Sequence, residues 1–262
     1  MNMMFYEQTY DDINMEVSFR EDKLEIERAM HETTCLLDTY AQLSYMEASD
    51  DSTGAPKRTN GLIGGIVKAF KTIIDKIRKV LNSISEGFSQ SFGKQLDENT
   101  YKNSETAQVR FSTDIRKICS DLDAEYNHAR KLVRTIASHT PLSEKQVADF
   151  LDNTSNMFHK HGPAVVKTSL VFGIGAALRK KARNLNKLTD EAELACKDIN
   201  TADSTQVKLA QKVLSGIFSL SNTVLNSLVM VENVKGTYAR NVVNDEMRAA
   251  KAAKKRAKKG MK

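Results

Sequence analysis

The chain has 262 residues and a formal net charge of +6, with 40% hydrophobic and 27% charged residues. This composition is ordinary for a soluble globular protein, and the length is ample for a buried core. The three cysteines, Cys35, Cys119 and Cys196, are odd in number and far apart, which argues against a disulfide framework or a zinc site and favours a reducing compartment.

The first 48 residues predict an acidic helix, running from about Tyr6 to Ala48. Between Met1 and Asp51 there are 3 basic and 13 acidic residues. The segment Met1–Asp12 carries acids and no basic residue before an apolar run, so we expect no secretory signal peptide. Residues 49–61 contain the breaker-rich segment Ser49–Pro56 and are predicted to be a linker.

A cationic amphipathic helix is predicted at 62–92, the start of a helical bundle domain at 62–238. Apolar residues recur there at intervals of three and four, and the other face is rich in lysine. Such a stripe usually belongs to a core, but a glycine-rich entry and a basic face also fit a helix that binds a membrane surface or a partner's groove. The candidate membrane-binding or partner-binding residues are Ile66, Phe70, Ile73, Ile77, Lys68, Lys71, Lys76 and Lys79.

The rest of the bundle is predicted to contain long helices, because only three prolines interrupt the whole chain. Residues 104–138 show a nearly heptad, coiled-coil-like seam from Phe111 to Ile136. Capping boxes at Ser143–Gln146 and Asp203–Gln206 predict helix starts, the first helix reaching about His159 and the second about Val234. His161–Pro163 predicts a break, and Thr189 or Asp190 is expected to cap a helix through Ile199.

The helix at 204–234 is the candidate for the centre of the core, because its apolar face is broad. Its uncharged run from Val213 to Val231 is nearly long enough to cross a bilayer. Seven serine, threonine and asparagine residues in that run favour a helix buried in a bundle instead. The expected fold is therefore all-α, an elongated bundle of six to eight helices with a basic C-terminal arm and no strands.

Three short patterns resemble chemical sites, and each has a simpler structural explanation. Glu125 and His128 have the spacing of a carboxylate-bridged metal site, but only one copy of that motif occurs. His159 and His161 lack nearby ligands, and Gly173-Ile174-Gly175 fits close helix packing better than a dinucleotide loop. No catalytic motif is present, so we expect no enzyme, cofactor or metal.

Residues 239–262 form a basic alanine- and lysine-rich tail. Between Met247 and Lys262 there are eight basic residues and no acidic residue. Such a charge density favours sequence-independent binding to nucleic-acid phosphates, and it also attracts anionic lipid or serves only for solubility. The candidate nucleic-acid-binding residues are Arg248, Lys251, Lys254, Lys255, Arg256, Lys258, Lys259 and Lys262.

Three segments together resemble virion structural proteins of tailed bacteriophages, in particular their internal or head-associated helical proteins. They are the acidic opening Met4–Ile13, the glycine-led helix Gly61–Val67 with Ile73–Ile77, and the lysine- and alanine-rich tail. The resemblance implies a non-enzymatic particle component, packed against DNA or released with it, in the virion or the host cytoplasm. The expected partners are other proteins or further copies of the chain, and nucleic acid through the tail. The alternative is a membrane-active protein acting through 62–92.

Overall fold

A computed structural model describes residues 56–86, 108–158, 160–199 and 203–259, together with the helical positions 24, 25, 27, 28, 31, 32 and 35. Side chains are described from 64 to 82 in the first of these ranges and up to 235 in the last, and not at 172. The predicted helix at 6–48 therefore lies mostly outside the described residues. Its described positions are helical and exposed, and Glu25 forms an ion pair with Lys76.

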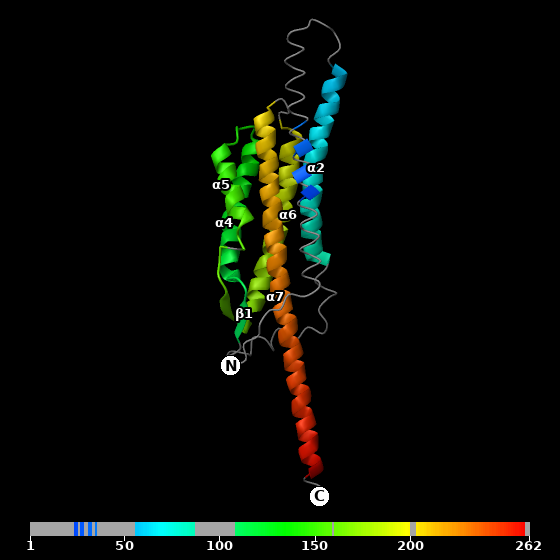
Figure 1. Ribbon diagram of the computed structural model, residues 1–262, viewed down its shortest axis with the longest axis vertical. Coiled ribbons are helices and arrows are strands. Elements are labelled where there is room, and N and C mark those ends of the chain that lie inside the picture. The colour runs from blue at the N-terminus through cyan, green and yellow to red at the C-terminus, as the bar shows by residue number, and fades with distance from the viewer. Residues whose placement is uncertain are drawn as a thin grey trace.

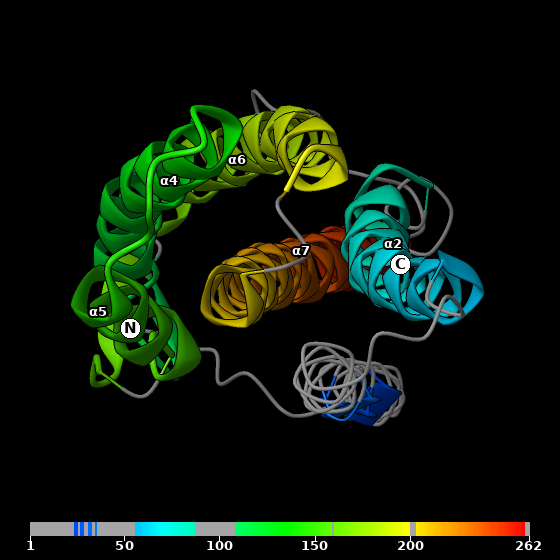
Figure 2. The same ribbon diagram turned by 90° about the horizontal axis from the view of Figure 1, so that it is seen from above.

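The described part of the chain is mostly α-helical, with five helices and one small sheet. The elements in chain order are α2 (Pro56–Glu86), β1 (Gln108–Phe111), α4 (Ile115–Ala137), α5 (Glu144–Ser155), β2 (Ala164–Lys167), α6 (Thr168–Lys197) and α7 (Ser204–Lys259). The helices run roughly along one long axis (Figure 1). Seen along that axis, α5, α4 and α6 form an arc on one side of α7, and α2 packs on the other (Figure 2).

Helix α7 is the centre of the core, as its broad apolar face predicted. It packs against α2, α4, α5 and α6. The apolar side chains of its first half are almost completely buried: Val207, Ala210, Val213, Leu214, Ile217, Leu220, Val224, Leu228 and Val231. Burial on several sides accounts for the breadth of its apolar face.

Helix α2 buries its apolar stripe against α6 and α7. Ile66, Phe70, Ile73 and Ile77 are between 0% and 4% exposed. The helix begins at Pro56, six residues before the predicted start, because proline is favoured at a first helical position. Its described part reaches Glu86, and the remainder of the predicted helix, residues 87–92, lies outside the described residues.

A two-stranded sheet replaces part of the helix predicted at 104–138. Strands β1 and β2 pair antiparallel, with Val109 opposite Val166 and Phe111 opposite Ala164. Val109 and Phe111 are buried and Arg110 between them is exposed, which is the alternation of a strand. The expectation of no strands was therefore wrong, and α4 begins only at Ile115, where Asp114 caps it.

Several predicted boundaries differ in the structure. Helix α6 continues without a break through Thr189, whose buried hydroxyl donates to the backbone oxygen of Leu185 instead of capping a new helix. Helix α5 ends at Ser155, and the Ser143 hydroxyl makes no capping bond although the helix starts where predicted. Helix α7 continues to Lys259 rather than ending near Val234.

The start of α7 is tied to the loop between α4 and α5. Asp203 caps the helix by accepting from the backbone N–H of Gln206, at 3.0 Å. The Gln206 side chain does not complete the predicted capping box, because it binds the backbone of Leu142 instead. Its Oε1 accepts from the Leu142 N–H at 2.7 Å, and its Nε2 donates to the Leu142 oxygen at 3.4 Å. This fixes the register of α7 against the α4–α5 pair.

Candidate functional site

The predicted nucleic-acid-binding residues lie at the far end of α7. The helix extends well past the ends of the other labelled helices (Figure 1). At 1.5 Å per residue, the stretch from 235 to 259 is about 36 Å long. On helical periodicity, positions 248, 251, 255, 258 and 259 fall within about 100° of one another. The candidate positions up to 259 thus belong to the same continuous helix as the core, and Lys262 lies outside the described residues.

A buried ion-pair cluster holds α7 against α6 near the point where α7 leaves the bundle. The Glu232 side chain is 2% exposed, and its Oε1 accepts from the Arg179 guanidinium at 2.7 Å and from the Lys235 ammonium at 2.9 Å. A buried carboxylate is stable only when such partners replace its lost hydration. Sequence analysis missed this cluster, although an acid within the apolar face of 204–234 is a recognisable signal.

Gly175 allows α6 and α7 to approach closely at this cluster. A Cβ atom on Gly175 would lie 3.1 Å from the Lys235 Nζ and 3.3 Å from Val231 Cγ1. Gly173 has open space around it. The structural interpretation of this glycine pair therefore holds for Gly175, whereas Gly173 makes no close contact.

The candidate residues of α2 are divided between the core and the surface. The apolar residues Ile66, Phe70, Ile73 and Ile77 pack inside the protein. On the other face, Lys68 and Lys71 are exposed. Lys79 is also exposed but has an interaction partner, and Lys76 forms an ion pair with Glu25.

Arg78 joins α2 to α6. Its guanidinium donates to the Asp190 carboxylate at 3.0 Å and also pairs with Glu193. Hydrogen bonding from Arg78 holds the pKa of Glu193 below its ordinary value. The hydrogen bonds that Arg78 donates, first to Asp190 and then to Glu193, raise the pKa of Arg78. These ion pairs hold α2 against α6 in addition to the apolar contact between the two helices.

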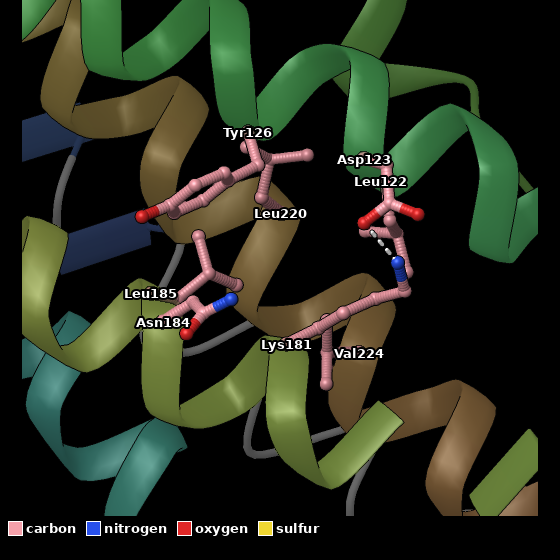
Figure 3. A pocket seen from close by; sticks show the side chains of 8 residues that line it. All are labelled: Leu122, Asp123, Tyr126, Lys181, Asn184, Leu185, Leu220 and Val224. Carbon is pink, nitrogen blue, oxygen red and sulfur yellow. Dashed lines mark hydrogen bonds and ion pairs between the residues drawn. The ribbon is translucent and has the colours of Figure 1, made fainter. Parts of the chain in front are cut away.

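A small cavity lies where α4, α6 and α7 meet (Figure 3). The Lys181 ammonium and the Asp123 carboxylate form an ion pair beside it. Its volume of about 20 Å³ is enough for a single water molecule and excludes an organic ligand. Its lining residues are Leu122, Asp123, Tyr126, Lys181, Asn184, Leu185, Leu220 and Val224.

A wider groove of about 440 Å³ runs between α5 and the first turns of α7. Val147, Leu151 and Leu209 form its floor, with acids on the α5 wall and lysines on the α7 wall. No cysteine or histidine lines it.

The residues considered for metal binding are engaged in other contacts. His128 Nδ1 lies 3.2 Å from Glu125 Oε2, and the His128 ring packs edge-on against Phe150. His161 pairs through Nε2 with Asp121 of α4 at 2.7 Å, and His159 is outside the described residues. Within the described ranges, no group of three or more histidine, cysteine, aspartate or glutamate side chains is arranged to hold a metal ion.

Cys196 is buried and Cys119 is half-buried, and both thiols are weaker acids than an ordinary cysteine. Burial raises the pKa of Cys119 to about 11 and that of Cys196 to about 12. A thiol with such a pKa is protonated at neutral pH and is a poor nucleophile or metal ligand.

One helical segment, Ser204–Lys235, is long and apolar enough to span a membrane, and most of it is buried by its neighbours. Three of its hydroxyls donate to backbone oxygens of the helix itself, namely Ser219 to Ser215, Ser221 to Ile217 and Thr223 to Ser219. Ser227 Oγ is buried and has no hydrogen-bond partner among the residues that the structure describes. These contacts match the prediction of a helix buried in a bundle.

Comparison with known proteins gives no assignment. No protein-family model matches the sequence, and neither the curated proteins nor the solved structures yielded a match.

Proposed function

We propose that this protein is a non-enzymatic structural or assembly component of a phage particle. In this proposal its basic C-terminal arm contacts nucleic acid. The observation that supports the proposal is the form of α7. One 56-residue helix is both the centre of the core and the carrier of the basic tail. Charge at the tail is then joined directly to the packed body, without a flexible linker at 236–246.

The chemistry of the tail fits a phosphate backbone better than a base-reading site. Its eight basic residues supply charge, and no aromatic residue follows Tyr238 to stack on bases. Each phosphate that is neutralised releases counterions, so binding driven by the tail is strongly salt-dependent and independent of sequence.

The test is duplex DNA binding by fluorescence anisotropy over a salt series. The arm substitutions Lys251→Ala and Lys255→Ala should reduce the salt slope by about 2, at roughly 0.9 per lost phosphate contact. The matched control removes the same charge from exposed positions of α2 by Lys68→Ala and Lys71→Ala, and it should leave the slope unchanged. Removal of 247–262 should abolish the tail's contribution altogether. Unaltered binding after that truncation would show that the arm is not the contact.

A membrane-active function is the second candidate, favoured by the span-length apolar segment of α7 and the basic outer face of α2. Insertion of α2 would require its apolar stripe to leave the core. The four residues Ile66, Phe70, Ile73 and Ile77 each contribute about 1.5–3 kcal/mol through burial. The large free-energy cost of exposing these four side chains makes a membrane-active function the less favoured proposal.

Co-sedimentation with phosphatidylserine vesicles tests the membrane function. Lys68→Glu with Lys71→Glu should weaken anionic-vesicle binding while leaving the helical circular dichroism intact, because both lysines are exposed. Ile73→Glu is not a clean probe, because it buries a charge in the core and unfolds the protein.

A further inference from the structure

The outward sides of α4 and α6 form a second basic surface, separate from the arm. Helix α4 contributes Lys117, Lys131 and Arg134, and α6 contributes Lys180, Arg183 and Lys187. All six side chains are exposed. None has an ion-pair or hydrogen-bond partner for its charged group within the described ranges, so these charges are available to a ligand. We call these six residues the α4–α6 face.

The two helices present these charges as one continuous surface. They lie side by side in the arc around α7 (Figure 2). The ion pair between Asp123 and Lys181 connects the two helices directly. The spacing of the α6 residues, three and then four positions, keeps them on one side of that helix.

Three acidic side chains near this face have partners in the structure. Asp123 pairs with Lys181, Glu125 with His128, and Asp121 with His161. The three acids lie on the sides of α4 that meet neighbouring elements. Glu191 is an exposed acid on the outward side of α6, beyond Lys187, and the exposed Asp190 beside it pairs with Arg78. The α4–α6 face therefore keeps a strong positive potential, which attracts polyanions and concentrates them locally.

The side chains between these charges favour a nucleic-acid backbone over a lipid surface. The exposed large hydrophobic residues of the described chain are Leu24, Val67, Val165, Leu170 and Leu194, and none lies within 117–134 or 180–187. Interfacial membrane binding needs such side chains to enter the lipid, whereas exposed Ser120 and Asn127 are polar groups of the kind that contact phosphates.

We propose that the α4–α6 face binds the phosphate backbone of duplex nucleic acid as a second contact beside the arm. The inference rests on the proposed function, in which nucleic acid is the partner. From Lys117 to Arg134 the helix rises about 26 Å, which matches roughly eight base pairs of a duplex. Two contacts on one chain raise the effective concentration of each site for the other.

Four proteins test the proposal by anisotropy with a short labelled duplex over a salt series. The face variant carries Lys131→Ala, Arg134→Ala, Arg183→Ala and Lys187→Ala. The second protein lacks 247–262, and the third combines both changes. The control carries Lys68→Ala, Lys71→Ala, Lys145→Ala and Lys212→Ala, four exposed lysines on α2, α5 and α7. Circular dichroism checks that each protein remains folded.

The face variant should reduce the salt slope by up to about 4 and weaken binding at least tenfold, and the control should bind as the unmodified protein does. If the face variant binds normally while the truncated protein does not, the face proposal is wrong and the arm assignment stands. If the truncated protein still binds and the combined variant does not, the face is the principal contact. The unmodified protein could also fail to bind the duplex and instead bind phosphatidylserine vesicles through the α4–α6 face. In that case the arm proposal and the face proposal are both wrong, and the face binds lipid.

Discussion

The ion-pair cluster at Glu232 gives a sharp stability prediction. Glu232→Gln keeps the shape of the side chain and removes its charge. The Lys235 ammonium, on a residue 8% exposed, then loses the carboxylate at 2.9 Å, whereas Arg179 is 44% exposed and can turn to solvent. Removing one partner of a buried pair typically destabilises by about 3–5 kcal/mol, because the remaining buried charge loses the opposite charge that offsets its lost hydration. We expect a loss of that size.

Equilibrium urea unfolding, followed by circular dichroism, measures the effect. A loss of 3–5 kcal/mol corresponds to a fall in Tm of roughly 6–20 °C for a protein of this size. The matched control is Glu193→Gln, which breaks a partly exposed pair with Arg78 and should cost below about 1 kcal/mol. The double substitution Glu232→Leu with Lys235→Met removes both charges and should recover most of the stability.

The reasoning fails if Glu232→Gln and Glu193→Gln have the same small effect. It also fails if the double substitution is as unstable as the single one, because burial of charge would then not be the cause. Hydrogen exchange gives an independent check: amides of α7 beyond 232 should exchange faster in Glu232→Gln than in the control, since this cluster holds α7 to α6.

Three further predictions follow from local packing and charge. Gly216→Ala should destabilise by about 1–3 kcal/mol in urea unfolding, because its Cβ would lie 2.2 Å from the Phe150 ring, while Gly173→Ala, with open space, should stabilise slightly. Cys196 should react with a thiol reagent at pH 8 only under denaturing conditions, because its pKa is about 12 and it is buried; rapid native labelling would contradict this. The lowered pKa of Glu193 contributes stability that is present above its ordinary value of 4.5 and is lost as the pH falls through the folded pKa, so acid titration of unfolding should show a loss that Glu193→Gln lacks.

Where burial follows the helical period, the sequence alone determined the fold. The apolar stripe of α2, the seam from Ile115 to Ile136 in α4, and the broad face of α7 are all buried as their spacing predicted. The helix starts at Glu144 and Ser204 were also predicted from local residues, although only Asp203 makes the expected side-chain cap and Ser143 does not. The functional assignment to the tail residues stays a prediction, as does the resemblance to phage virion proteins.

Contacts between distant segments were decided only by the tertiary structure. Strand β1 has four residues, and its pairing with β2 joins Gln108 to Lys167, so no local pattern could reveal it. Thr189 looked like a cap but is satisfied within α6. The pairs of Glu232 with Arg179 and of Asp123 with Lys181 depend on which helices pack together, and so does the exposure of the basic residues on α4 and α6. Helical periodicity shows which side of a helix is buried, but the neighbour that buries it is chosen by the packing of the whole chain.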